Sequence, residues 1–155
     1  MVILGAWFLT REIELAAAVV KHVRFEALHK KVAWALPMSK TDQRGNMIDR
    51  SHICACPVDG SREPLCPYHA MRDLLDLREI APTDAPLFDD GNGQVMTKEY
   101  SIQAIRGILE RAQIPLTRLG GSNKEEHRFG GHTLRVAGAQ FLASHNVPLH
   151  TIYFF

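Results

Sequence analysis

The sequence has no long apolar run, and it carries almost no excess of charge of either sign. No apolar stretch approaches the roughly 20 residues that a membrane-spanning helix needs, so we expect no membrane partner. The opening MVILGAWFLT is apolar, but it lacks a basic segment and a clear small-residue cleavage site, which favours the start of a helix over a signal peptide. With 18 Lys and Arg against 17 Asp and Glu, the formal net charge is +1. Global charge therefore does not indicate a nucleic-acid-binding protein, and such a function must rest on individual residues.

Cysteine is absent from most of the chain, because Cys54, Cys56 and Cys66 all lie in one short stretch. An odd number of clustered cysteines does not suit the framework of a secreted, disulfide-bonded domain. A reducing interior keeps such thiols free for a metal. We therefore expect an intracellular protein, cytoplasmic or nuclear.

The stretch HICACPVDGSREPLCPYHAM has the pattern C-x-C-x9-C-x2-H, formed by Cys54, Cys56, Cys66 and His69. Three thiolates and one imidazole are a chemically sound tetrahedral set for a structural zinc. If Cys54 and Cys56 lie on a strand, they point to the same face, and His52 is a substitute ligand on that strand. The spacing is not that of a standard zinc finger. The alternative is three buried, reduced cysteines that pack as small apolar residues.

Hydrophobic residues make up 46% of the 155 residues, which is enough for the core of one ordinary domain. Helical spacing of apolar residues predicts a first helix over about residues 2–21. Two extended runs, HVRFEAL and HKKVAWALPM, predict a hairpin. The turn-forming residues of SKTDQRGN separate this hairpin from a third strand in MIDRSHICAC. The simplest arrangement is a meander of three antiparallel strands.

Helices dominate the rest of the chain. YHAMRDLLDLREI predicts a short helix, and Thr97 is a candidate cap for a helix that runs to about Gln113. LTRLGGSNKEEHRFGG is expected to form a polar loop, and a final helix is expected to begin near His132. The predicted class is therefore α+β, mainly α, with helices around a small three-stranded antiparallel sheet.

Arg11 is a charged residue on the apolar stripe of the first predicted helix, with Glu14 one turn further on. An unpaired buried charge is costly. One interpretation is a structural ion pair between these two side chains, which lie three positions apart. The other is an anion site in a cleft, in which Glu14 orients the guanidinium and the planar fork of Arg11 binds two phosphate oxygens.

His132 and Arg135 pose the same choice near the end of the chain. They lie three positions apart, so they share a helix face. The helix follows two glycines, and the free N–H groups at its start favour an anion. A histidine at a helix start is commonly only a polar end residue, and an H-x-x-R match occurs by chance. The set adds weight: an arginine in an early helix, a lysine in a strand–strand turn, and H-x-x-R on a late helix.

Together these segments resemble the catalytic domain of tyrosine recombinases, the phage-integrase family. FLTREIELAAA resembles the family's first box, in which an arginine is followed three residues later by a glutamate and then by a leucine. MSKTDQRG resembles its strand–turn segment with the lysine. HRFGGHTLRVAGAQFLASHNVPLHTI resembles its second box and the helix after it. The resemblance covers most of the chain in the family's order, and S-K-T-D and H-x-x-R are its most specific parts.

The resemblance implies cleavage and rejoining of duplex DNA through a covalent 3′-phosphotyrosyl intermediate, with no metal in catalysis. It implies that Arg11 and Arg135 bind the scissile phosphate and stabilise its added charge in the transition state. Lys40 would be the general acid that protonates the departing 5′-oxygen, and His132 would assist proton transfer. Glu14 would orient Arg11. Without the other residues, Lys40 would be interpreted as a solvated turn lysine.

The sequence departs from the family pattern near its end, where the family has a further His or Trp and then the nucleophilic tyrosine. Tyr153 is the only tyrosine after Arg135, but it follows by only eighteen positions and has apolar neighbours, so we expect a packing residue rather than the nucleophile. Residues 1–155 are therefore expected to be a single, incomplete catalytic domain, inactive as this chain, with a zinc-binding insertion at 52–69. A homo-oligomer on DNA is a further expectation.

Two other functions compete with a recombinase. A zinc-stabilised, non-enzymatic DNA- or protein-binding module would bind stoichiometric zinc and tolerate the loss of His132. A non-functional fragment would fold poorly and aggregate. Convergence of Arg11, Lys40, His132 and Arg135 in one cleft would separate the recombinase hypothesis from both.

Overall fold

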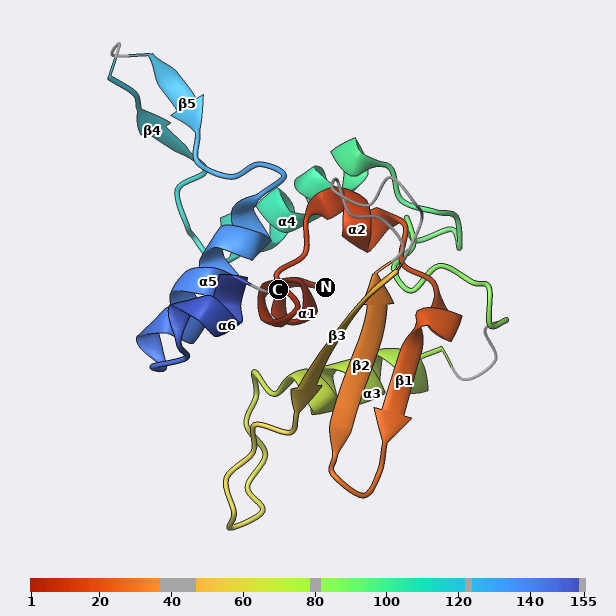
Figure 1. Cartoon of the computed structure of the whole chain (residues 1–155). Helices are drawn as coiled ribbons and strands as arrows, with labels where there is room; N and C mark the ends of the chain where they lie inside the picture. Colours follow the sequence, from red (N-terminus) through yellow and green to blue (C-terminus); the bar gives the residue numbers. More distant parts are fainter. Residues whose placement is uncertain (37–46, 79–81, 122–123, 154–155) are drawn as a thin grey trace.

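The computed structural model describes residues 1–36, 47–78, 82–121 and 124–153, and Figure 1 labels its elements. The helices are α1 (Val2–Trp7), α2 (Glu12–Ala16), α3 (Pro67–Asp76), α4 (Lys98–Arg111), α5 (Thr133–Ser144) and α6 (Leu149–Tyr153), with a 3-10 turn at Val20–His22. The strands are β1 (Val23–Glu26), β2 (Lys31–Leu36), β3 (Ile48–Ile53), β4 (Thr117–Leu119) and β5 (Glu125–His127). Helices surround a small antiparallel sheet, which confirms the predicted fold class.

The main sheet is an antiparallel meander in the order β1–β2–β3. Its register pairs Val23 with Trp34 across the hairpin, and Trp34 with Arg50 on the other side. The central strand β2 is the most buried, and α3 lies across one face of the sheet (Figure 1). The predicted meander is therefore confirmed.

The core lies between the sheet and the helices. Phe8, directly after α1, packs edge-on against Trp34 with 5.3 Å between the ring centroids. Both side chains are fully buried. Other large side chains that are almost completely buried are Leu4, Leu15, Leu36, Met71, Leu87 and Val32. The core therefore joins α1, α2, the central strand β2 and α3.

The first helix does not run unbroken over residues 2–21, so that prediction is wrong. α1 ends at Trp7, Leu9 adopts a left-handed φ of 48°, and Arg11 is extended with φ −89° and ψ 161°. The buried Thr10 hydroxyl bonds back to the Gly5 carbonyl at 3.3 Å, which closes the end of α1. Arg11 is therefore the cap of a second helix and not part of an apolar stripe.

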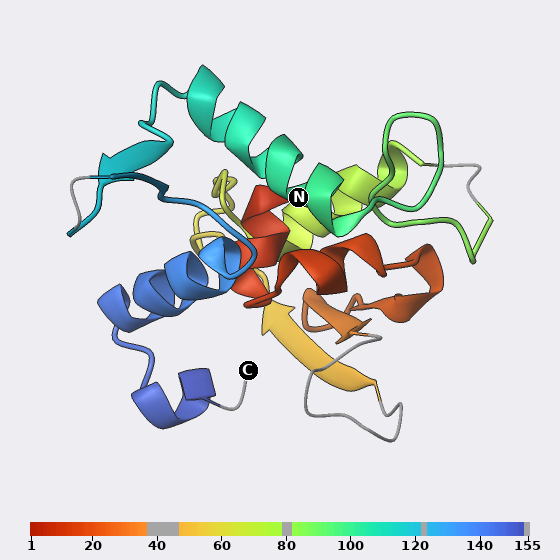
Figure 2. The same ribbon diagram turned by 90° about the horizontal axis from the view of Figure 1, so that it is seen from above.

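Two glycines allow α1 and α5 to pack closely, as Figure 2 shows from above. A Cβ atom at Gly138 would lie 1.9 Å from the Ala6 carbonyl oxygen, and one at Gly5 would lie 2.4 Å from Leu134 Cδ1. Real Cβ atoms do not approach other atoms so closely, so larger residues would push the helices apart. This contact brings the first half of α5 beside the end of α1.

The segment that was expected to be a polar loop contains a second sheet of two short strands. β4 pairs antiparallel with β5, with Thr117 opposite His127. The hairpin projects away from the body of the molecule (Figure 1). Each strand has only three residues, and most of them are exposed, so no apolar alternation marks them in the sequence.

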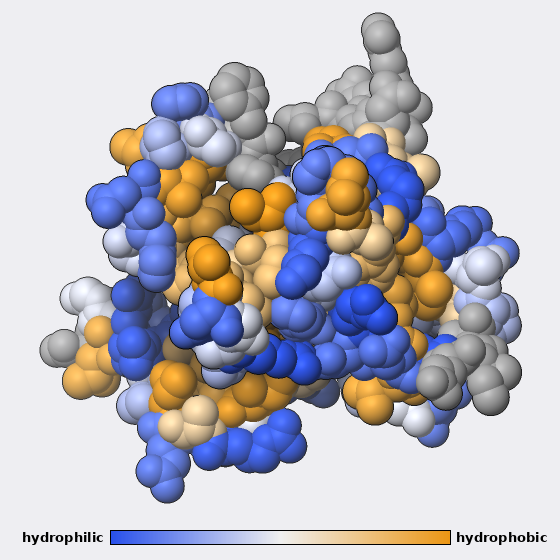
Figure 3. Space-filling model, turned by 90° about the horizontal axis from the view of Figure 1, so that it is seen from below, coloured by the Kyte–Doolittle hydropathy of each residue, from blue (hydrophilic) through white to orange (hydrophobic). Residues whose placement is uncertain are grey.

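The described surface mixes polar and apolar side chains, as Figure 3 shows from below. Large apolar side chains are strongly exposed at Leu28, Val58, Leu77 and Leu149, which belong to four different segments. Within the described ranges, no helix combines the length and the apolar character that crossing a bilayer requires.

Candidate anion site and metal centre

Arg11 and Glu14 meet where α2 begins. Nε and Nη2 of Arg11 donate to Glu14 Oε1 at 3.1 and 2.8 Å, and the Arg11 backbone N–H donates to Oε2 at 2.7 Å. The Glu14 side chain is 1% exposed and that of Arg11 is 11% exposed. The structure therefore contains the contact between Arg11 and Glu14 that their spacing indicates. Charge-assisted hydrogen bonds fix the guanidinium in place.

Arg135 reaches the same carboxylate from α5. Its Nη2 lies 3.2 Å from each oxygen of Glu14, although the two residues are 121 positions apart in the sequence. Its Nε donates to the Leu9 carbonyl at 2.6 Å. In the described part of the chain, the Nη1 groups of Arg11 and Arg135 donate to no protein acceptor. Two guanidiniums therefore share one carboxylate and keep donors for a further anion.

Arg50 is a third arginine at this site, and it was not predicted from the sequence. It lies on β3, is 5% exposed, and its Nη1 donates to the carbonyls of Phe8 and, at 3.0 Å, Leu9. Burial and, to a smaller extent, the positive charge of Arg135 lower the pKa of Arg50 to about 10, although Glu14 partly offsets them. One signal in the sequence could have found Arg50. The alternation of the predicted third strand places this charged residue on the face that is turned toward the core.

His132 lies beside this cluster in the sequence but does not join it by hydrogen bonds. It is the N-cap of α5 and is exposed, and its imidazole has no hydrogen-bond partner among the described residues. It lines a hollow of about 440 Å³ together with Arg128, Phe129 and Val136. His132 is therefore open to solvent at the helix start, three positions before Arg135.

Two further residues named from the sequence cannot be added to this geometry. Lys40 and the whole S-K-T-D turn lie outside the described residues. Tyr153 is the last residue of α6, and its side chain also lies outside what the structure describes. Of the four predicted phosphate-site residues, the structure thus brings Arg11 and Arg135 together.

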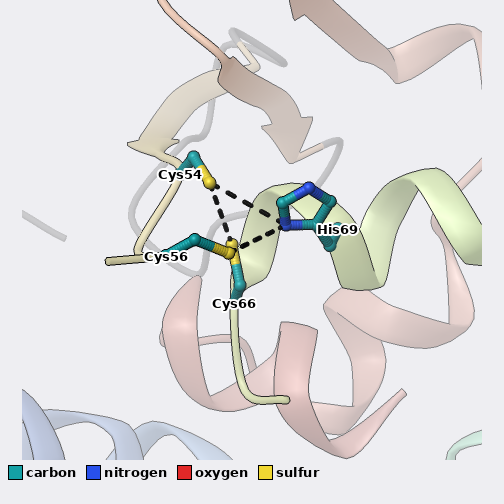
Figure 4. Close-up of side chains that lie close together, drawn as sticks. All are labelled: Cys54, Cys56, Cys66 and His69. Atoms are coloured by element: carbon teal, nitrogen blue, oxygen red, sulfur yellow. Dashed lines mark hydrogen bonds between the residues drawn. The ribbon is translucent and has the colours of Figure 1, made fainter. Parts of the chain in front are cut away.

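The other group of functional side chains is the cysteine–histidine cluster (Figure 4). The expectation that Cys54 and Cys56 lie on a strand is wrong, because β3 ends at Ile53 and both cysteines follow it. Cys66 is the N-cap of α3, and His69 lies in the first turn of that helix. The four ligand atoms of Cys54, Cys56, Cys66 and His69 all lie within 4.8 Å of one another and could hold a metal ion.

The spacing of the ligand atoms suits a tetrahedral ion. Bonds of about 2.3 Å to sulfur and about 2.05 Å to nitrogen would set two sulfurs about 3.8 Å apart, and a sulfur and a nitrogen about 3.6 Å apart. Cys54 Sγ and Cys66 Sγ lie 3.6 Å apart. His69 Nδ1 lies 3.8 Å from Cys54 Sγ and 3.2 Å from Cys56 Sγ. These side chains therefore need only small movements to coordinate zinc.

Backbone N–H groups surround the sulfurs. The N–H of Ala55 donates to Cys66 Sγ and that of Glu63 to Cys56 Sγ, both at 3.3 Å. Burial opposes ionisation of Cys66, but hydrogen bonds from the N–H groups of His69 and Ala55 and from the side chains of His69 and Cys54 together lower the pKa of this thiol to about 6. Burial raises the pKa of the Cys54 thiol. Donors to ligand sulfurs are the outer contacts that orient and stabilise thiolates at a metal.

The comparison with solved structures agrees with this architecture. No protein-family model matches the sequence, and no curated protein matches it. Among solved structures, the chain is similar to the site-specific recombinase XerH, captured in a pre-cleavage complex with difH substrate. The chain shares its fold with a site-specific recombinase. The TM-score is 0.61 over 97% of this chain.

The likeness to XerH concerns the fold and only part of that protein. Sequence identity is 16%, and the chain spans 36% of the length of the XerH chain. A likeness at this identity shows a shared fold, and the same fold can carry different functions.

Proposed function

We propose that this chain is a tyrosine-recombinase-like domain that binds duplex DNA by holding a backbone phosphate between Arg11 and Arg135. The observation that carries this proposal is the carboxylate of Glu14, which is 1% exposed and accepts hydrogen bonds from both arginines. The likeness of fold to a site-specific recombinase supports it.

The balance of charge around Glu14 favours an anion. Arg11 and Arg135 pair with this single carboxylate, and the buried positive charge of Arg50 lies near enough to be influenced by it without contact. Burying like charges together is unfavourable unless further negative charge compensates them. A phosphodiester supplies that charge, and its oxygens match the planar donor pattern of arginine.

The roles that follow for strand breakage and rejoining are part of the same proposal. Arg11 and Arg135 would stabilise charge on the attacked phosphate, and Glu14 would orient them. Lys40 would protonate the departing 5′-oxygen, and His132 would bind phosphate and assist proton transfer. A tyrosine would form the 3′-phosphotyrosyl link, and Tyr153 is not assigned that role. We therefore propose that the 155-residue chain binds DNA without cleaving it.

We also propose that the cysteine–histidine cluster binds one structural zinc, within a single domain that spans residues 1–155. Four protein ligands fill a tetrahedral shell, so no coordination position is left for a substrate. The insertion at 52–69 would then serve to fix β3 against α3. Assembly as a homo-oligomer on DNA is a further part of the proposal, which sedimentation of the DNA complex would test.

Binding of a labelled pool of duplex DNA, followed by fluorescence anisotropy at several salt concentrations, tests the proposal. We expect affinity to fall steeply between about 50 and 200 mM salt. Arg135→Ala should weaken binding and reduce the slope of log K against log salt by about one unit, since one phosphate contact is lost. Arg62→Ala is the matched control, because Arg62 is an exposed arginine in the loop between β3 and α3 and pairs with Asp73 of α3. Salt-insensitive binding, or equal effects of both variants, would overturn the proposal.

Cleavage is tested separately with a suicide duplex substrate and a denaturing gel that traps covalent protein–DNA adducts. We expect no adduct from this chain. An adduct that disappears in Tyr153→Phe would show that Tyr153 is the nucleophile after all.

A zinc-stabilised, non-enzymatic binding module is the second candidate, and the well-formed cysteine–histidine cluster favours it. It predicts binding of DNA or a protein that persists when both Arg135 and His132 are replaced by alanine. The recombinase-like proposal predicts that DNA binding is lost in that double variant.

A further inference from the structure

Arg50 connects the sheet to the anion site without touching the carboxylate that organises it. Its position on β3 faces inward, and its guanidinium donates to the carbonyls of Phe8 and Leu9 at the end of α1. Arginine is a costly choice for a buried carbonyl partner, because its charge must leave water. Capping the carboxyl end of α1, where the carbonyls carry partial negative charge, explains a cationic donor to Phe8, whereas the contact with Leu9 lies beyond the helix.

The Leu9 carbonyl is shared between two arginines. Arg135 Nε donates to it at 2.6 Å and Arg50 Nη1 at 3.0 Å. Leu9 itself has a φ of 48°, in the left-handed region that leucine rarely adopts. Such a conformation costs about 1–3 kcal/mol and persists only where its surroundings hold it, which is common at functional sites. The two charged donors are the groups that fix this carbonyl.

The shared carbonyl also determines where Arg135 points. With Nε bonded to Leu9 and Nη2 to Glu14, the guanidinium of Arg135 is fixed along one edge. Its Nη1 is then directed away from both partners. If the Leu9 carbonyl rotated, Arg135 would lose one of these two anchors and the direction of its free donor.

We propose that Arg50 is a positioning residue of the anion site: it holds the Leu9 carbonyl in the orientation that Arg135 needs to bind a phosphate. This inference rests on the proposed DNA-binding function. Arg50 does not contact the anion. It acts through one peptide group on the residue that does.

A graded pair of substitutions tests the inference. Arg50→Lys keeps the charge but offers one compact ammonium for two carbonyls, and Arg50→Gln keeps a neutral donor. Folding is checked first by cooperative unfolding in urea and by zinc content. We expect duplex affinity to fall about threefold to tenfold for Arg50→Lys and about thirtyfold to a hundredfold for Arg50→Gln, the range of couplings between residues in one network. The slope of affinity against salt should change less than in Arg135→Ala, because Arg50 contacts no phosphate.

A second measurement separates positioning from general destabilisation. In a chain that already carries Arg135→Ala, adding Arg50→Gln should lower duplex affinity by about a further threefold or less, because the residue through which Arg50 acts is gone. An undiminished loss in that background would overturn the inference. Unchanged DNA affinity in a folded Arg50→Gln variant would overturn it as well. If only Arg50→Lys folds, unchanged DNA affinity in that variant would do the same. Absence of salt-sensitive binding by the unchanged chain would instead overturn the proposed function itself.

Discussion

At Glu14, one carboxylate that is almost fully buried accepts hydrogen bonds from two guanidiniums and one backbone N–H. Carboxylate and guanidiniums compensate one another's loss of hydration. The residue therefore has two roles, because it stabilises the join between α2 and α5 and it aligns the proposed phosphate donors.

Replacing Glu14 with glutamine should affect stability and binding together. The amide keeps the shape but leaves neighbouring guanidiniums uncompensated, so we expect the free energy of unfolding to fall by about 3 kcal/mol. DNA affinity should also fall, since Arg11 and Arg135 lose their common anchor. Urea denaturation and anisotropy measure the two effects. Glu99→Gln, on the exposed side of α4, is the control and should change neither.

Contacts between site residues that are close in the sequence were predictable from the sequence. Contacts between site residues that are far apart in the sequence were predictable only in part. The contact between Arg11 and Glu14 spans three positions, so spacing alone indicates it. No local signal shows that Arg135 meets the same carboxylate, and only the resemblance to a known family joined the two. Arg50 was missed because its carbonyl partners at Phe8 and Leu9 depend on packing of the strand against α1.

At the scale of elements, the close crossing of α1 and α5 determines where Arg135 lies. Gly138 sits against the Ala6 carbonyl, and Gly5 against Leu134. These helices are far apart in the chain, and their small residues let the backbone of α1 come near α5. The arginine site is thus positioned by packing that contains no charge.

Gly138→Ala should separate the helices. Its Cβ would meet the Ala6 carbonyl at 1.9 Å, so we expect a loss of about 1–3 kcal/mol in the free energy of unfolding. DNA binding should weaken as Arg135 moves away from Glu14.

Gly107→Ala on α4 is the matched control for this substitution. A Cβ there meets nothing within 4 Å, so higher helix propensity should stabilise the chain by about 0.5–1 kcal/mol. Similar unfolding midpoints for the two variants would contradict the packing argument.

Most helices and the meander were predictable because periodic apolar residues mark them. Thr97 caps α4 as predicted, with its hydroxyl accepting the Tyr100 N–H at 3.1 Å. The break at residues 9–11 was not predictable from periodicity, because apolar spacing continues across it while a left-handed residue and a side-chain cap interrupt the helix. The β4–β5 hairpin was missed for the opposite reason, since exposed polar strands carry no apolar pattern.

At the scale of the whole molecule, the cysteine–histidine cluster and the arginine site are parts of one connected structure. The Trp7 indole donates to the carbonyl of Leu65, the residue directly before Cys66, at 2.7 Å. β3 carries Arg50 and runs straight into Cys54. The loop that bears the cysteines is therefore bonded to α1, and the residues that follow α1 supply the carbonyls that bind Arg50 and Arg135.

Removal of zinc should therefore reduce both stability and DNA binding. A hollow of about 430 Å³ beside Cys54, Cys56 and His69 gives a chelator access to the site. We expect chelation to cost about 3 kcal/mol, which corresponds to roughly 6–12 °C in Tm for a domain of this size.

Metal analysis and thermal unfolding, before and after chelation, check this prediction. Stoichiometric zinc should restore the Tm and the DNA affinity, whereas magnesium should not, because thiolates prefer the softer ion. A freshly purified chain that contains no zinc and is not stabilised by it would show that the cluster is only three packed cysteines and a histidine.

The most direct test of the central claim, that Arg11 and Arg135 hold one phosphate together, is a double-mutant cycle on duplex DNA affinity. Arg11→Ala, Arg135→Ala and the double variant are compared with the unchanged chain at one salt concentration. The claim predicts a coupling energy of about 1 kcal/mol or more, because each arginine contributes less to DNA affinity once the other has been removed. Losses that add to within about 0.5 kcal/mol would contradict it, since they would mean that the two arginines bind DNA independently or not at the same phosphate.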